Sequence, residues 1–329
     1  MPERAEALQR VQFGVETTPG NVVPANRRLL ATGISVSERA RGYDSFVPQG
    51  ALYPTVVVPG RQWVEAPITA RPSYTDLVYL LSSLIGKTTP VQVGSTAAYT
   101  WTFTPHSDGS DVPQTYTVEY GDVNAASRFR NAVVTGLEFS FAPDRAELSG
   151  TIIGSTFEEN VPLTANPTAI KPVVIAPKTV AVYLDNDPAQ IGTTKLTRAF
   201  ALSLRLTDKY QPEFTIDPDV ESYAALVPAR PTTQVQLTVE FDAQAYARRA
   251  AWKAGSTEFL RVKAVGPVID PGPPATTYQF TLDVAVKWTD VGTLDFTDGI
   301  YTVRATGVMA EDETFGLGSW TVVTTVAAL

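Results

Sequence analysis

The chain of 329 residues contains no cysteine and a single histidine. Without cysteine it has no disulfide framework, no thiolate zinc site and no cysteine nucleophile. His106 lies near Asp108 and Asp111 in a segment rich in turn-forming residues. A metal site built from these three side chains is one interpretation. We favour a polar hairpin loop, because the spacing lacks the closing glutamate of a calcium loop.

Catalytic signatures are also lacking. The sequence has no G-x-S-x-G elbow and no phosphate-binding glycine loop, and its single loop histidine makes no convincing serine triad. Paired carboxylates occur, as at Asp185/Asp187, but nothing in the sequence places a pair across one cleft as a glycosidase requires. We therefore expect no catalytic residues, no enzymatic activity, no cofactor and no metal.

Basic clusters and long apolar runs are absent as well. The net charge is −8 and the pI is about 4.8. A nucleic-acid-binding surface neutralises phosphates with Lys and Arg, so we expect no specific DNA binding. A wall past which nucleic acid slides stays compatible with this charge. The longest apolar stretches fall short of the ~20 residues that span a bilayer, so we expect no membrane insertion.

What the sequence does contain is an internal repeat at a shift of about 168 to 170 residues. Four segments recur in the same order: 30–36 with 200–206, the helical stretches that end at Gly86 and Gly255, 116–122 with 284–290, and 142–144 with 310–312. Two copies are too few for a solenoid. The repeat therefore predicts two whole domains of one type.

Alternating apolar and polar residues predict the fold class. Segments 278–288 and 235–241 follow a period of two, which is typical of antiparallel strands with one buried and one wet face. Helical patterns occur at 73–85 and 242–254, and each ends at a glycine. We predict a mainly β protein of two tandem β-sandwich or barrel domains, each with one short helix and a long loop.

Proline spacing and the repeat set the domain boundaries. We predict an N-terminal arm at 1–28, a first β domain at 29–157, a proline-rich linker at 158–177 and a second β domain at 178–329. A proline at every fifth position of the linker stiffens an extended chain and disfavours a central strand.

Two loops, 37–60 and 207–231, are longer than most structureless connections. Their aromatic residues argue against disorder and indicate a surface that contacts a partner. A loop or extra hairpin folded back on its own sheet is the alternative. The candidate residues for contacts between chains or rings are Arg41, Tyr43, Phe46, Tyr210 and Phe214.

Four segments carry a family resemblance. Pro-Lys-Thr-Val-Ala-Val-Tyr-Leu-Asp-Asn at 177–186 and Gly-Thr-Thr-Lys-Leu-Thr at 192–197 resemble the start of the C-terminal half of tail tube (major tail) proteins of long-tailed, non-contractile bacteriophages. Phe-Gly-Val-Glu-Thr-Thr-Pro-Gly at 13–20 and Glu-Leu-Ser-Gly at 147–150 resemble the N-terminal segment and a hairpin of that family. The resemblance implies β domains with one helix and a protruding loop, six of which form each ring of a hollow tube.

With two such domains in each chain, the resemblance implies a ring of three chains with pseudo-sixfold shape. Stacked rings would conduct double-stranded DNA to the host during genome ejection. The implied partners are further copies of the chain, a tape measure protein, and terminator and baseplate proteins. The implied location is the tail of the virion, assembled in the host cytoplasm. Closure into a ring would also protect the edge strands.

The lumen of such a tube should be polar and net acidic, because Lys and Arg would hold DNA phosphates in place. The candidate lumen residues are Thr117, Glu119, Gln279, Thr281 and Asp283, and the outer face of the tube is their alternative position. Two other functions stay open. One is another virion component, such as a decoration or tail terminator protein, and the other is a duplicated carbohydrate-binding β-sandwich with an exposed aromatic platform.

Overall fold

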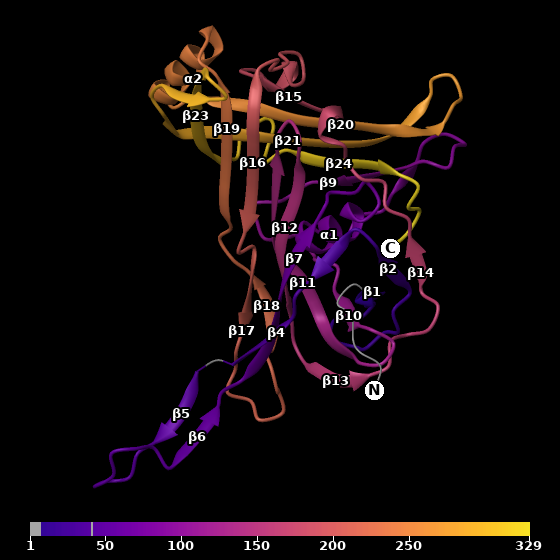
Figure 1. Ribbon diagram of the computed structural model, residues 1–329, viewed down its shortest axis with the longest axis vertical. Coiled ribbons are helices and arrows are strands. Elements are labelled where there is room, and N and C mark those ends of the chain that lie inside the picture. The colour runs from indigo at the N-terminus through magenta and orange to yellow at the C-terminus, as the bar shows by residue number, and fades with distance from the viewer. Residues whose placement is uncertain (1–7, 41) are drawn as a thin grey trace.

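A computed structural model of the chain describes residues 8–40 and 42–329. These residues are mainly β structure (Figure 1), as the alternating sequence patterns predicted. The described residues contain two α-helices, α1 (Leu77–Leu84) in the first half and α2 (Ala243–Ala254) in the second. Two short 3₁₀ turns, Pro177–Thr179 and Pro188–Gln190, flank the first strand of the second half.

The first half contributes fourteen of the described strands: β1 (Arg10–Val15), β2 (Arg27–Leu29), β3 (Thr32–Ile34), β4 (Ser37–Ala40), β5 (Tyr43–Phe46), β6 (Val56–Pro59), β7 (Gln62–Ala70), β8 (Val91–Gln92), β9 (Tyr99–Phe103), β10 (Tyr116–Gly121), β11 (Ala126–Phe141), β12 (Ala146–Gly154), β13 (Phe157–Val161) and β14 (Thr168–Ile170). The second half contributes ten: β15 (Val180–Asp185), β16 (Ala199–Thr207), β17 (Tyr210–Glu213), β18 (Ala225–Pro228), β19 (Thr232–Glu240), β20 (Thr257–Asp270), β21 (Thr276–Val291), β22 (Asp295–Thr297), β23 (Ile300–Met309) and β24 (Ser319–Thr324).

Helix α1 begins four residues later than the sequence pattern predicted, after Asp76. The Asp76 carboxylate does not cap the helix but accepts hydrogen bonds from Ala31 N and Thr32 Oγ1, both at 3.1 Å. Burial raises the pKa of this carboxyl group. Every residue of α1 is buried, because the helix lies inside the core rather than on its surface.

The two halves repeat one strand order. In the first half, antiparallel pairing connects β3, β7, β12, β11, β10 and β1 in that sequence. In the second half, β16, β19, β23, β21, β20 and β15 are connected in the same way. The helix follows β7 in one half and β19 in the other. The duplication read from the sequence is therefore present in the strand topology.

Two of the four sequence matches, however, join strands that the topology does not make equivalent. Segment 116–122 covers β10, whereas its match at 284–290 lies on β21, the counterpart of β11. Likewise 142–144 is the turn between β11 and β12, whereas 310–312 follows β23, the counterpart of β12. The offset arises because β8 and β9 intervene between α1 and β10, while only two residues separate α2 from β20.

A shared irregularity supports the structural alignment of β11 with β21. The register of β11 against β12 shifts between Val134 and Gly136. The register of β21 against β23 shifts between Trp288 and Asp290. Bulges of this kind re-aim a strand, and each long strand changes partners near its bulge.

The halves are not separate domains joined by a free linker. Strand β11 pairs antiparallel with β16 of the other half, and β9 pairs antiparallel with β24. Within the predicted linker, β13 pairs with β11 and β14 pairs in parallel with β2. Within the predicted N-terminal arm, β1 pairs with both β2 and β10. Sequence position alone did not reveal these pairings, because the partners lie far apart in the chain.

Phe139 on β11 connects the cores of the two halves. Its ring stacks on Phe280 of β21 at 5.4 Å between centroids and meets Trp320 of β24 edge-on at 5.8 Å. All three side chains are fully buried. The two halves therefore share one core as well as one sheet.

This shared core predicts a single unfolding transition for the dissociated chain. Phe139→Ala should lower the free energy of unfolding by about 3–5 kcal/mol, because it removes a buried aromatic ring and leaves a cavity. Phe46→Ala, the same truncation at an exposed site, should change it by less than about 0.5 kcal/mol. Urea denaturation followed by tryptophan fluorescence and by circular dichroism tests both. Two separated transitions, with only one shifted by Phe139→Ala, would contradict the shared core.

Candidate assembly surfaces

The pairing of β11 with β16 joins the sheets of the two halves, and we call it the junction. One face of the sheet that crosses this junction is polar and open to solvent. Along β7, β12, β11, β16, β19 and β23, buried apolar side chains alternate with exposed or half-buried polar ones. The strand registers place these polar side chains on one face: Thr69, Ser149, Glu147, Glu138, Ser140, Ser203, Arg205, Gln236, Thr238, Arg304 and Thr306. We call this surface the polar face. It is built from both halves of the chain.

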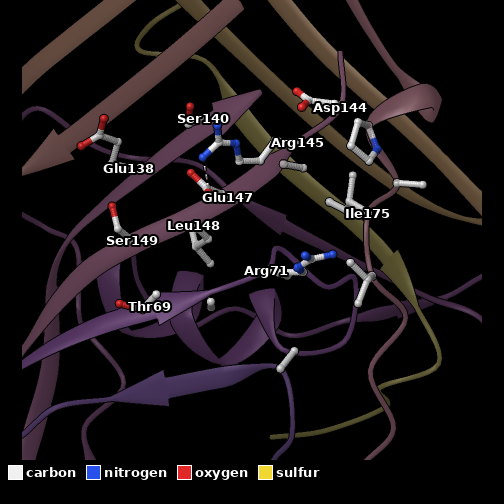
Figure 2. Close-up of a pocket in the computed structure, with 16 residues that line it drawn as sticks. Thr69, Arg71, Glu138, Ser140, Asp144, Arg145, Glu147, Leu148, Ser149 and Ile175 are labelled. Carbon is white, nitrogen blue, oxygen red and sulfur yellow. Dashed lines mark hydrogen bonds and ion pairs between the residues drawn. The ribbon is translucent and has the colours of Figure 1, made fainter. Parts of the chain in front are cut away.

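Figure 2 shows the part of the polar face formed by β7, β11 and β12, where a groove of about 850 Å³ lies. Arg145 and Glu147 form an exposed ion pair of 3.3 Å there. Glu138 accepts a hydrogen bond from the Ser203 hydroxyl across the junction, at 3.1 Å. Acidic and basic side chains are thus interspersed with Ser and Thr along the groove, which gives it the character of a hydrated surface.

The structure contradicts the prediction that Thr117 and Glu119 line a lumen, because both side chains are buried within the chain. The Glu119 carboxylate accepts hydrogen bonds from Thr164 N and Thr164 Oγ1, both at 2.7 Å. The Thr117 hydroxyl donates to Glu16 Oε1 at 2.9 Å. Alternation along β10 correctly separated two faces, but the segments around Glu16 and Thr164 cover the face that we expected to be wet.

The three candidates on β21 are covered to different degrees. Asp283 is buried and forms a bidentate ion pair with Arg261 of β20, at 2.7 and 2.8 Å. Thr281 is buried and accepts a hydrogen bond from the half-buried Gln279 at 3.0 Å. The lumen assignment is therefore wrong for Asp283 and Thr281, and Gln279 stays untested. The strands of the polar face show the same alternation of apolar and polar residues as β10 and β21. The sequence pattern alone therefore does not tell which strand face is exposed, and the pairing across the junction does.

The first long loop forms a hairpin of β5 and β6 that projects away from the body of the molecule (Figure 1). Tyr43 is 69% exposed and Phe46 is 63% exposed. Six further large apolar side chains of this hairpin are exposed: Val47, Leu52, Tyr53, Val56, Val57 and Val58. We call residues 43–59 the arm. Contiguous exposed apolar side chains of this kind mark interaction sites. Arg41, the other candidate in this loop, lies outside the described residues.

The second long loop folds back on its own chain instead. Tyr210 is buried, so the prediction that it contacts a neighbouring chain is wrong. Phe214 meets Trp63 of β7 edge-on at 5.5 Å, and the Tyr223 hydroxyl donates to Asn131 O at 2.8 Å. The hairpin (β17 and β18) thus packs on β7 and β11 of the first half of the same chain, and not on the sheet of its own half as the alternative had it. It supports the base of the arm.

His106 belongs to a network of polar side chains between the halves. Its Nδ1 lies 2.7 Å from Asp111 Oδ1, and the buried Lys209 ammonium group lies 2.6 Å from Asp111 Oδ2. Burial lowers the pKa of Lys209, and the neighbouring Asp111 opposes this shift. Asp108 instead accepts hydrogen bonds from Ser110 within the turn, at 3.0 Å to N and 2.6 Å to Oγ. Among the described residues, no three metal-ligating side chains gather here or elsewhere.

Comparison with known proteins adds no family to these observations. The sequence matches no protein-family model, and no curated protein matches it significantly. Across residues 8–40 and 42–329, no helix has the length and apolar character needed to cross a bilayer. The function is therefore inferred from the surfaces described above.

The exposed apolar arm predicts self-association. Replacing Phe46, Leu52 and Tyr53 together with serine should leave the fold intact, because all three are exposed and such changes cost little stability. The same variant should reduce association of the purified protein at least tenfold, measured by sedimentation. Val123→Ser, an exposed apolar site outside the arm, is the control and should associate like the wild type. Unchanged association of the triple variant would show that the arm is not a contact surface.

Proposed function

We propose that the chain is a tail tube protein of a long-tailed bacteriophage, which forms stacked rings of three chains around a hollow lumen. The observation that carries this proposal is the polar face. It spans six strands from both halves, its polar side chains are exposed or half-buried, and residues 174–177 border its groove. A sheet that is apolar on one face and polar and solvent-exposed on the other can form the wall of a tube when its two edges pair with those of neighbouring chains.

The charge pattern of the polar face suits the passage of DNA. Glu138 and Glu147 are balanced by Arg205 and Arg304, and the remaining side chains are mostly Ser, Thr and Gln, so this face is polar but not net acidic as we expected of a lumen. A cluster of basic groups would gain free energy from counterion release at each phosphate and would retain the duplex. A hydrated wall with few charges, on a chain of net charge −8, offers no such gain. We assign the polar face to the lumen.

The arm supplies the contact between rings in this proposal. Aromatic side chains such as Tyr43, Phe46 and Tyr53 anchor interfaces through large rigid contact areas. The hairpin of β5 and β6 extends away from β11, β12, β16, β19 and β23 (Figure 1), so its side chains can reach a neighbouring ring without entering the lumen. Tape measure, tail terminator and baseplate proteins are the further partners that the proposal requires, and it requires no cofactor and no catalysis.

Electron microscopy of the purified protein tests the proposal. We expect hollow tubes or rings at high protein concentration, with a lumen wide enough for a DNA duplex. The triple serine variant of the arm should give single rings that do not stack. Particles that remain single chains at all concentrations, or a monomer that binds glycans, would contradict a tail tube and favour a carbohydrate-binding module.

A further inference from the structure

The sheet that crosses the junction has two open edges. Among the described residues, β3 and β4 pair only with β7 at one end, and β22 pairs only with β23 at the other. A groove of about 610 Å³ runs beside Thr32 and Gly33 of β3. Open edges present unpaired N–H and C=O groups to which another strand can add.

The first open edge is the counterpart of a strand that is already paired. In the first half, Ile34 of β3 lies opposite Ile68 of β7. In the second half, Leu202 of β16 lies opposite Leu237 of β19. Strands β3 and β4 therefore correspond to β16 at a shift of 168 residues. Whereas β16 is joined to β11, the corresponding side of β3 and β4 pairs with no strand in residues 8–40 and 42–329.

The second open edge is the counterpart of β11. Ser140 and Phe141 of β11 lie opposite Glu147 and Ala146 of β12. At the same places in the second half, Asp295 and Phe296 of β22 lie opposite Thr302 and Tyr301 of β23. Strand β22 thus continues the edge that β11 presents to β16. It corresponds to the end of β11 at a shift of 155 residues, against 154 at the end of β21, so one residue is inserted between β21 and β22. Extending the β22 register by one position places Leu294 at the position of Phe139.

The two counterparts differ in burial. Phe139 and Phe141 are buried at the junction with β16, whereas Leu294 is 46% exposed and Phe296 is 64% exposed. The second half therefore carries the apolar side of a junction that has no partner within the described chain. A strand that pairs with β22 should resemble β16. Strands β3 and β4 together are the counterpart of β16, and their outer edge is unpaired among the described residues.

We propose that residues 291–297, including β22, pair antiparallel with β3 and β4 of a second copy of the chain, in the register of the β11–β16 junction. Phe296 then lies opposite Ile34, and Leu294 lies opposite Val36, as Phe141 and Phe139 lie opposite Leu202 and Leu204. Between these apolar pairs, Asp295 lies opposite Ser35, at the position where Ser140 lies opposite Ser203 in the β11–β16 junction.

This contact is head to tail, because the β22 edge of one chain pairs with the β3 and β4 edge of the next. Contacts of this type generate closed rings when the rotation between copies closes, and open filaments when it does not. The pairing deepens the proposed ring and rests on it. It identifies which strands meet and which residues lie opposite one another.

The absence of cysteine from the chain allows a direct test. Opposed residues of antiparallel strands have Cα atoms about 4.5–5.5 Å apart, within the range that a disulfide bridges. The variant Ser35→Cys with Asp295→Cys, assembled at high protein concentration and then mildly oxidised, should give covalent products of more than one chain on a non-reducing denaturing gel. Ser140→Cys with Ser203→Cys is the matched positive control, because these residues lie opposite each other within one chain and should cross-link without a change in mass.

Ser45→Cys with Asp295→Cys, which places one cysteine on the arm, should give no such products. Monomer alone from the Ser35 and Asp295 variant, while the Ser140 and Ser203 control cross-links, would overturn the pairing. If that variant still formed hollow tubes, the pairing would fail and the proposed function would stand. Cross-linked products that stop at three chains support both the proposed pairing and the three-chain ring. An open ladder of longer products would support the pairing and contradict the three-chain ring.

Discussion

The antiparallel pairing of β11 with β16 is the interaction on which the rest of the structure depends. It joins the sheets of two repeated halves into one, and it places Phe139 against Phe280 and Trp320 in a core that both halves share. Burial of apolar surface is the dominant favourable term in folding, so this junction fixes how the halves face each other. It also fixes that the polar side chains of both halves lie on one side of one sheet.

The same junction explains the exposed edges. When a duplicated unit pairs head to tail with its own copy, one edge of each kind is left unpaired, and among the described residues these edges are β3 with β4 and β22. Natural proteins blunt such edges or cover them. Here one edge carries Leu294 and Phe296, which are exposed in the single chain, and covering them with the other edge of a second copy removes both liabilities together. The arm adds a separate apolar surface in a different direction (Figure 1).

Local patterns in the sequence predicted the strands, the helix in each half and the duplication, because alternation and glycine stops depend on neighbouring residues. They did not predict which polar strand face is wet. The alternation of β10 resembles that of β11, yet Glu119 is covered by Thr164 while Glu138 faces the open groove. They also misaligned β10 with β21, because β8 and β9 are inserted in one half only. The exposure of Tyr43 and the burial of Tyr210 likewise depend on contacts between distant segments.

The central claim is that the junction within the chain is repeated between chains until a ring closes. The number of chains in one ring tests it most directly, and native mass spectrometry of rings released from assembled protein measures that number. The account predicts three copies of the 35.5 kDa chain, so that six repeated halves complete the ring. A ring of six chains would contradict it, because six chains would supply twelve halves.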